Sequence, residues 1–393
     1  MRSATVSDRL VIARAARDWA ASSADEFERR LRLVTSIDSG PDNVSGRDEV
    51  AGLLAGWCRQ AGCDVELVPH ALGTHLIAAL PGRGQGRVVL LGHHDTVFPA
   101  GTAAERPLVV RDGVAAGPGV ADMKGGLLLG LATLEALSRG PRDFAAVELH
   151  SVPDEEVRTV AFATLDRTAD ANAVLVLECG RENGDLVSGR KTGAWLRVSV
   201  AGRSAHVGTE PDLGHSAVLG LCHEVTRIST LDGARPGLTI MAGTIVGGTT
   251  PNVVPDAAEA IIDVRSPRRV DFDWALQEIA RSGAYEGLTI QVEDAGTWPG
   301  IEPSPDSALM LAEALRIACA LGHPLGHQTS GGMSDGCWTA AEGVPTLDGL
   351  GPVGGRDHSP DEYVLLESVP TRCGVVAGLC IARGRYAATE GGG

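Results

Sequence analysis

Residues 87–97 read RVVLLGHHDTV, and they decide how the first half of the chain is interpreted. The apolar run Arg87 to Gly92 is short, as is typical of a strand buried on both faces. Polar residues follow it directly. Similar strands are expected at 145–151 and 173–177, and helical patterns occur at 50–61 and 124–138. Strands that alternate with helices predict a mixed, mostly parallel α/β sheet, whose sites lie at the carboxyl ends of its strands.

The pattern changes from about Gly189. Three stretches alternate apolar and polar residues, and two helical patterns lie between them: 195–200, 257–264 and 288–292 for the strands, 215–228 and 272–281 for the helices. Such alternation is typical of antiparallel strands with one solvated face. We therefore expect a smaller α+β domain at residues 188–302, inserted into a larger α/β domain made of residues 1–187 and 303–393. Thr389 to Gly393 are expected to form a disordered tail.

Composition excludes several classes of protein. A chain of 393 residues is long enough for two domains. A net charge of −16 argues against nucleic-acid or anionic-membrane partners, which require clustered positive charge. No apolar run reaches the roughly 18 residues of a membrane span, and the N-terminus lacks the apolar centre of a secretory signal. The eight cysteines are scattered without a CxxC pair, which favours reduced thiols and a cytoplasmic location.

Three polar clusters in the first half contain residues suited to metal chemistry. In GHHDTV (92–97), one histidine could bind a metal while Asp95 orients an imidazole. In GPGVADMKGG (117–126), a glycine-rich turn without phosphate-loop spacing, the Asp122 carboxylate could bridge two cations. PDEEV (153–157) places three carboxylates side by side, and these repel one another unless a cation neutralises them. Adjacent glutamates could divide the work, one binding metal and one holding a proton.

Two more clusters complete the set. Glu178 ends the strand at 173–177, and His358 lies in the glycine-rich loop GGRDHSPDEYV (354–364). Cys179, beside Glu178, is more typical of a small buried residue than of a ligand. Taken singly, each of the five clusters also fits a polar strand end, a helix cap or a surface loop. Their joint occurrence carries the metal-site hypothesis.

In their order along the chain, GHHDTV, GPGVADMKGG, PDEEV, Glu178 and GGRDHSPDEYV resemble the motifs of the glutamate carboxypeptidase and aminoacylase family of di-zinc metallopeptidases. That family includes acetylornithine deacetylase and succinyl-diaminopimelate desuccinylase. The resemblance extends from about residue 25 to 385, and over 92–126 it is closest to the glutamate carboxypeptidase branch. It implies a zinc-peptidase catalytic domain with an inserted lid and dimerisation domain.

The resemblance also implies a role for each motif residue. One metal would be held by His93 and Glu178, the other by Glu156 and His358, with Asp122 bridging both. Zinc is implied, although cobalt or manganese suits the same ligands. His94 stands at the variable position of GHxDT and is not assigned as a ligand, whereas Asp95 would orient the imidazole of the preceding histidine.

The implied reaction is hydrolysis of an amide or peptide bond next to a free carboxylate, of the carboxypeptidase or N-acyl-amino-acid deacylase type. Glu155 would be the general base that takes a proton from a metal-bridging water and delivers it to the departing amine. The acyl group and the amine of the substrate are not specified by these residues.

Four residues of the second half resemble lid and substrate positions of the family. His206, in GRSAHVG (202–208), would reach the active site of the partner subunit and stabilise the oxyanion, which implies a homodimer. Asn252, Arg265 and the backbone of Gly332 would bind the substrate. Trp298, in TWPG (297–300), stands where glutamate-releasing relatives tend to carry arginine. A neutral aromatic group there weakens the case for a C-terminal glutamate and favours an apolar or aromatic substrate group.

Two alternatives stay open. The same metals could serve an N-carbamoyl or other C–N hydrolase of specialised metabolism, an alternative kept open by Trp298. The chain could also be a non-catalytic binding protein that keeps the peptidase fold. Such a descendant would be expected to lack a ligand or the base, and this chain lacks neither.

Overall fold

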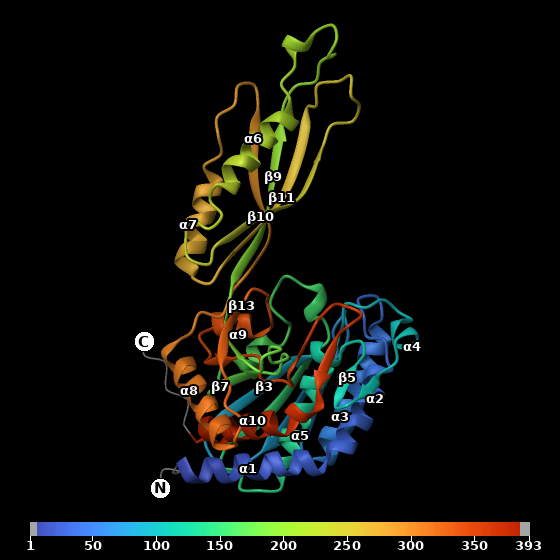
Figure 1. Cartoon of the computed structure of the whole chain (residues 1–393), viewed down its shortest axis with the longest axis vertical. Helices are drawn as coiled ribbons and strands as arrows, with labels where there is room; N and C mark the ends of the chain where they lie inside the picture. The colour runs from blue at the N-terminus through green and yellow to red at the C-terminus, as the bar shows by residue number, and fades with distance from the viewer. Residues whose placement is uncertain (1–5, 386–393) are drawn as a thin grey trace. The chain divides into compact units, whose positions relative to one another are not determined.

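The computed structural model describes residues 6–385, so the tail expected at Thr389 to Gly393 lies outside the described residues. The chain forms two compact units, and each is described by itself (Figure 1). The first unit comprises residues 1–189, 303–329 and 334–393. The second comprises residues 190–302 and the short segment 330–333.

The first unit is built on a six-stranded sheet in the order β1-β2-β6-β3-β7-β14. The strands β6, β3, β7 and β14 run parallel, whereas β1 and β2 are antiparallel to their neighbours. The prediction of a mixed, mostly parallel sheet is therefore confirmed. The strands are β1 (Asp64–Val68), β2 (His75–Pro81), β3 (Arg87–His93), β6 (Ala146–Val152), β7 (Ala173–Val176) and β14 (Thr346–Leu347).

Helices cover this sheet and supply much of the core. The helix α5 is buried almost throughout, and the helices α1 and α10 pack against each other (Figure 1). Two glycines let α5 approach the end of β7: a Cβ on Gly126 would lie 2.0 Å from the carbonyl oxygen of Leu177, and one on Gly130 would lie 2.7 Å from its side chain. The helices are α1 (Val6–Ser22), α2 (Ala24–Thr35), α3 (Val44–Gln60), α4 (Thr102–Glu105), α5 (Gly125–Ser138), α8 (Pro305–Ala320), α9 (Gly336–Ala341) and α10 (Val369–Gly384).

Two small sheets complete the first unit. One has the order β15-β16-β5-β4 and joins the C-terminal loop to the segment before α5, and the other pairs β13 with β8. The strands are β4 (Val109–Arg111), β5 (Val114–Ala116), β8 (Leu186–Arg190), β13 (His327–Ser330), β15 (Gly354–Gly355) and β16 (Tyr363–Leu365).

Among residues 6–385, no helix combines the length and the apolar character needed to cross a membrane. All eight cysteines are free thiols.

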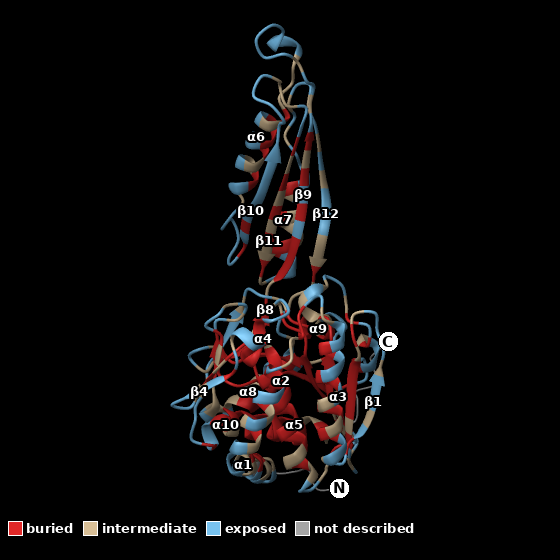
Figure 2. Ribbon diagram, turned by 90° about the vertical axis from the view of Figure 1, so that its right-hand side faces the viewer, coloured by how far each residue is buried: buried red, intermediate tan, exposed pale blue. Residues whose placement is uncertain are grey.

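The second unit is a four-stranded antiparallel sheet, in the order β10-β11-β9-β12, with two helices on one face. Buried residues alternate with exposed or partly buried ones along β9 and β11, so one face packs on the helices and the other is more open (Figure 2). The edge strand β10 exposes apolar side chains. The elements are β9 (Thr192–Ala201), α6 (Ala217–Ser229), β10 (Thr239–Gly247), β11 (Ala257–Ser266), α7 (Arg269–Ala280) and β12 (Thr289–Trp298).

Several elements differ from the sequence prediction: the strand β10 was not expected, and among the elements that were expected α3 and β12 are clearly longer. The helix α3 begins at Val44 and not at residue 50, because the side chain of Asn43 accepts the N–H of Gly46 and caps the helix. The strand β12 continues to Trp298 and does not end at residue 292. Its polar second half still pairs with β9 through backbone hydrogen bonds, with one irregularity between Asp294 and Gly296.

Candidate metal centre

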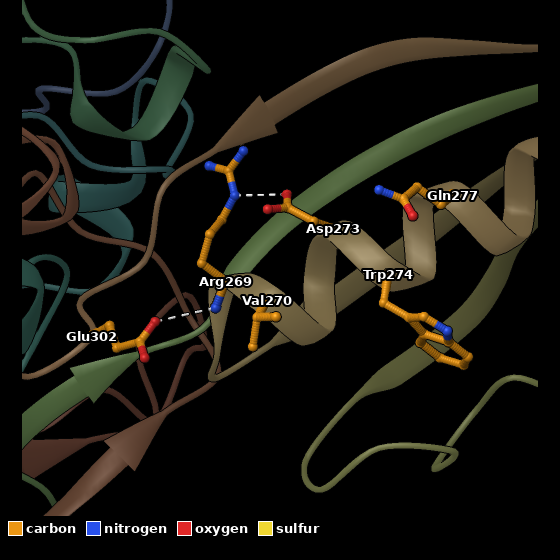
Figure 3. A pocket seen from close by; sticks show the side chains of 6 residues that line it. All are labelled: Arg269, Val270, Asp273, Trp274, Gln277 and Glu302. Carbon is orange, nitrogen blue, oxygen red and sulfur yellow. Dashed lines mark hydrogen bonds and ion pairs between the residues drawn. The ribbon is translucent and has the colours of Figure 1, made fainter.

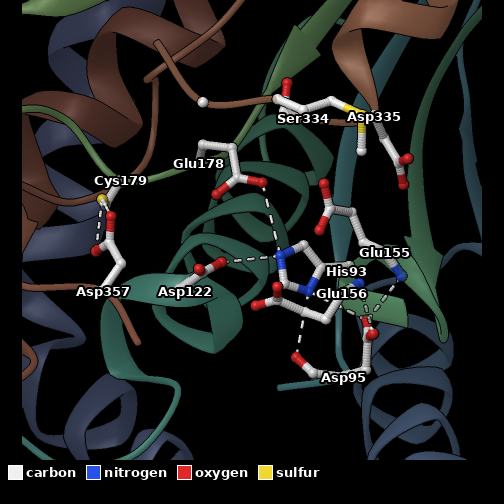
Figure 4. A network of polar contacts seen from close by, with 12 residues as sticks. His93, Asp95, Asp122, Glu155, Glu156, Glu178, Cys179, Ser334, Asp335 and Asp357 are labelled. Atoms are coloured by element: carbon white, nitrogen blue, oxygen red, sulfur yellow. Dashed lines mark hydrogen bonds and ion pairs between the residues drawn. The ribbon is translucent and has the colours of Figure 1, made fainter. Parts of the chain in front are cut away.

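Three neighbouring parallel strands carry acidic and imidazole side chains to one edge of the six-stranded sheet. His93 is the last residue of β3, and its register partner on β6 is Val152. The PDEEV segment continues directly from that point. Glu178 follows β7 by two residues. The strands' shared direction therefore gathers residues from three distant parts of the sequence (Figure 4).

Asp122 and His358 arrive from two loops. Asp122 lies in the irregular turn Val120–Lys124 that opens α5. One of its oxygens, Oδ1, lies 2.9 Å from Nε2 of His93, and the other, Oδ2, lies 3.0 Å from Nε2 of His358. Each end of this carboxylate thus faces a different histidine.

Each histidine also faces a glutamate. Nε2 of His93 lies 3.6 Å from Oε1 of Glu178, and Nε2 of His358 lies 3.1 Å from Oε1 of Glu156. Two sets of three ligand atoms result, and they share Asp122; within each set all atoms lie within 4.8 Å of one another. The structure thus brings together all five ligands expected from the sequence.

This geometry fits a pair of zinc-sized cations. Nitrogen and oxygen ligands of tetrahedral zinc lie about 2.0–2.2 Å from the metal, which places neighbouring ligand atoms about 3.3–3.6 Å apart. The separations of 2.9 to 3.6 Å seen here are close to that spacing. A carboxylate with one oxygen in each set is the arrangement that a bridging ligand requires.

Asp95 holds several of these residues in place. Its carboxylate is completely buried, and Oδ1 lies 3.2 Å from Nδ1 of His93. It also accepts the backbone N–H groups of Glu155, at 3.2 Å, and of Glu156, at 2.9 Å (Figure 4). His94 makes a separate contact, with Nδ1 2.7 Å from Oγ of Ser151, and belongs to neither ligand set.

The pKa shifts show how strongly the centre demands positive charge. The Asp122 and Glu156 carboxylates raise the pKa of His358 to about 11. Burial opposes the charged form of His93, but contacts with Asp122 and Asp95 raise its pKa well above the usual value. A divalent cation held by each histidine and its carboxylate neighbours would supply this positive charge in place of a proton.

Glu155 differs from the ligands in its surroundings. Burial raises its pKa well above the usual value; the charge of His93 opposes this rise, and Asp335 adds to it. One of its oxygens lies within 4.8 Å of ligand atoms of His93 and Glu156, so it borders the centre. Glu156, in contrast, also belongs to the set containing His358.

Two buried carboxylates near the centre were not assigned from the sequence. Asp335 pairs with Arg158, which also donates to Asp154 at 2.9 Å. Glu362 accepts backbone N–H groups of the turn that carries Asp122. Glu362 lies in the motif GGRDHSPDEYV quoted above, and Asp335 follows Gly332 by three residues. Burial of an acidic side chain is the signal that could have identified them, and the sequence alone does not give it.

The residues expected to bind substrate lie in the second unit. His206 is exposed, and its Nδ1 accepts the N–H groups of Gly208, at 3.1 Å, and of Thr209, at 3.2 Å. Its neighbour Val207 donates its backbone N–H to the carbonyl of Asn252 at 3.1 Å. The N–H of Gly332 is directed to Oγ of Ser330 at 3.3 Å.

Arg265 and Trp298 lie on either side of one glycine. Gly193 of β9 is the register partner of Arg265 on β11 and of Trp298 on β12, and a Cβ on Gly193 would lie 2.5 Å from the indole. The guanidinium therefore reaches across the glycine and lies 5.4 Å from the indole ring. Trp298 is only 5% exposed, so little of its ring is open to the apolar or aromatic substrate group that it was expected to contact.

A hollow of about 570 Å³ on α7 is separate from these residues (Figure 3). Its charged groups are already paired: Arg269 bonds Asp273 at 2.7 Å, and its backbone N–H bonds Glu302 at 3.2 Å. We therefore assign this hollow no part in the chemistry.

The fold and the centre together define a class: a metal-dependent hydrolase with a mixed-sheet unit and an inserted α+β unit. The chain belongs to the peptidase family M20/M25/M40, whose family model matches residues 89–382. The resemblance inferred from the motifs is thereby confirmed. Enzymes of this family are metal-dependent hydrolases of peptide or acyl-amino-acid bonds, and this chain is one of them.

Relatives support the same conclusion. The chain is 27% identical over 368 residues to carboxypeptidase G2 of Pseudomonas sp. (strain RS-16), covering 91% of this chain and 89% of that protein. It is 28% identical over 372 residues to succinyl-diaminopimelate desuccinylase of Alkalilimnicola ehrlichii, covering 88% and 95%. The crystal structure of aminopeptidase PepT from Bacillus cereus has the same fold, with a TM-score of 0.78, 21% identity and coverage of 92% and 99%.

Proposed function

We propose that the chain is a zinc enzyme that hydrolyses an amide or peptide bond next to a free carboxylate, with Glu155 as its general base. The observation that carries the proposal is the different placement of the two neighbouring glutamates of PDEEV. Glu156 belongs to a ligand set with Asp122 and His358, whereas Glu155 borders the centre and belongs to no set that contains either of them. One glutamate is thus placed to bind metal and the other to move a proton.

The ligand sets His93–Asp122–Glu178 and Asp122–Glu156–His358 would hold divalent ions, which when bound would lower the pKa of a water in the site and polarise the carbonyl of the substrate. Glu155 would take a proton from that water and give it to the departing amine. Its raised pKa, caused first by burial, makes it a stronger base than an exposed glutamate once it is ionised. Cations nearby would favour the ionised form, which the role of base requires.

For the oxyanion we propose His206 of the partner subunit. Because Nδ1 of His206 accepts two backbone N–H groups, the neutral ring carries its proton on Nε2 and can donate it. Homodimer formation is proposed through the edge strand β10. The exposed side chains there are Met241 (68% exposed), Ile245 (56%) and Val246 (71%), and an unpaired strand edge with apolar side chains suits pairing with a second copy.

Arg265 is the proposed partner of the substrate carboxylate, together with Asn252 and the Gly332 backbone. Asp263 takes Nε–H and one N–H of Nη2, and the carbonyl of Gly331 takes one N–H of Nη1. One N–H on each terminal nitrogen has no acceptor among residues 6–385. A carboxylate can accept two such N–H groups. Because the Trp298 ring is almost fully buried, we propose that it contributes to substrate binding by supporting the guanidinium of Arg265.

The test is a substrate panel on enzyme loaded with zinc, cobalt or manganese: N-acyl amino acids, dipeptides, γ-glutamyl amides and N-carbamoyl amino acids. Glu155→Gln should keep its metals and lose about 100- to 10,000-fold in kcat, the usual contribution of general acid–base catalysis. Glu49→Gln, an exposed carboxylate on α3, is the control and should match the parent. Full turnover after removal of metal by a chelator, or a Glu155→Gln variant as fast as the parent, would refute the proposal.

The same experiment separates the alternatives. Turnover of N-carbamoyl substrates alone would favour the C–N hydrolase of specialised metabolism. A protein that binds less than one ion per chain and turns over no member of the panel would be a binding protein with the peptidase fold. The expectation of a cytoplasmic enzyme stays a proposal that rests on its scattered free cysteines.

A further inference from the structure

The side chain of Glu362 is a buried carboxylate whose hydrogen bonds all come from one turn. It is 1% exposed. Oε2 accepts the backbone N–H of Gly119 at 2.9 Å, and Oε1 accepts those of Ala121 at 2.8 Å and Asp122 at 3.0 Å. Three charge-assisted bonds therefore fix the backbone of a bridging ligand and of the residues just before it.

The turn is shaped to receive an anion. Gly119 has a φ of +72°, and a Cβ there would lie 2.8 Å from Cγ2 of Thr96, so the position requires glycine. Successive N–H groups that point to one side of such a turn form a concave anion site. Glu362 fills that site from another part of the chain, about 240 residues away in sequence.

Glu362 also belongs to the loop that carries His358. The strand β16, which starts at the next residue, pairs with β5, and the carbonyl of Glu362 accepts the N–H of Gly117 at 3.3 Å. His358 itself has a φ of +61°, a left-handed conformation that is unfavourable for histidine and needs support from its surroundings. One side chain thus connects the loop of one ligand to the turn of another.

We propose that Glu362 is a positioning residue that sets Asp122 and His358 relative to each other, and so controls occupancy of the metal site formed by Asp122, Glu156 and His358. This inference rests on the two-metal centre of the proposed function. The other set, His93 with Glu178, is carried by strand ends and depends on Glu362 only through Asp122. Loss of Glu362 should therefore weaken the two sites unequally.

Glu362→Gln is the sharpest perturbation. The remaining amide oxygen can accept two of the three N–H groups, but the new NH₂ group would face the third, donor against donor. Asp361→Asn is the matched control, because it removes the same charge from the neighbouring position. The Asp361 side chain is 74% exposed, and its nearest cation, Arg356, is 3.9 Å away.

The experiment uses the full chain, stripped of metal and titrated with Co²⁺ and with Zn²⁺ in competition with a chromophoric chelator. Folding of each metal-free variant is checked by circular dichroism and thermal unfolding. The parent and Asp361→Asn should bind two ions. In Glu362→Gln the first ion should bind within about threefold of the parent, and the second about 10- to 100-fold more weakly, the usual effect of losing a group that orients metal ligands.

Glu362→Asp, which keeps the charge but shortens the side chain, should weaken the second ion by an intermediate amount. It replaces Glu362→Gln in the comparison if that variant does not fold. A folded variant that binds both ions like the parent, or that weakens both equally, would overturn the proposal. A parent that binds fewer than two ions would instead show that the two-metal centre of the proposed function is wrong.

Discussion

Replacing Asp95 with asparagine should weaken metal binding and folding by separable amounts. Oδ1 of this buried carboxylate faces Nδ1 of His93 and accepts the N–H of Glu155, and Oδ2 accepts the N–H of Glu156. Asparagine offers one acceptor oxygen. If that oxygen takes the place of Oδ1, the new NH₂ opposes the N–H of Glu156. If the amide is reversed, the NH₂ faces both the imidazole of His93 and the N–H of Glu155.

Both magnitudes follow from these contacts. Loss of a carboxylate that orients a ligand histidine lowers metal affinity about 10- to 100-fold, or about 1.4–2.8 kcal/mol. One buried N–H left without an acceptor lowers the free energy of unfolding by about 1–3 kcal/mol. The first effect is specific to the loaded protein, whereas the second persists in the presence of a chelator.

The assay for Asp95→Asn therefore has two arms: Zn²⁺ competition with a chromophoric chelator, and urea unfolding in excess EDTA. Asp361→Asn serves again as the exposed control. Zinc affinity within twofold of the parent, or a metal-free stability equal to that of the parent, would refute the assignment of these contacts.

Three further predictions follow from other contacts. Burial lowers the pKa of His75 from 6.5 to about 4, so the unfolded chain binds the proton more tightly than the folded one. The free energy of unfolding should therefore fall by up to about 3 kcal/mol between pH 6.5 and 4. Urea unfolding at a series of pH values should show a smaller fall for His75→Gln. Gly193→Ala should destabilise the second unit by about 1–3 kcal/mol in thermal unfolding, because the new Cβ meets the indole of Trp298 at 2.5 Å. The carboxylate neighbours of His358 raise its pKa to about 11, so a zinc ion that binds there must displace a proton. The apparent affinity for zinc, measured by calorimetry, should therefore rise between pH 6 and 9 by up to about tenfold per pH unit. An affinity that does not change with pH would contradict this.

The strands that carry His93, the PDEEV segment and Glu178 could be predicted because their signals are local, whereas the roles of the individual ligands were implied by the resemblance to a known family. A short apolar run such as residues 87–92 indicates a buried strand, and a polar group directly after it indicates a strand end. The helix α3 was predicted too short because the capping side chain of Asn43 lies outside the apolar pattern. The strand β12 was predicted too short because its second half is polar and is held by backbone pairing.

Roles that depend on long-range contacts could not be predicted from the sequence. Glu362 bonds only to backbone N–H groups, and these leave no trace in side-chain identities. The cover over Trp298 depends on Gly193 and Arg265 meeting it across three strands, which requires the register of the sheet. The sequence therefore indicated which residues could bind metal, but not which residues hold them in place.

The order of the strands has a consequence for synthesis of the protein on the ribosome. Five of the six strands of the main sheet, and the ligands His93, Asp122 and Glu178, all lie within the first 178 residues. His358 emerges 180 residues later, which at about 5–20 residues per second corresponds to roughly 10–40 s of translation. One complete ligand set can therefore form on a nascent chain well before the second exists, and a divalent cation can bind it before the C-terminal loop completes the pair.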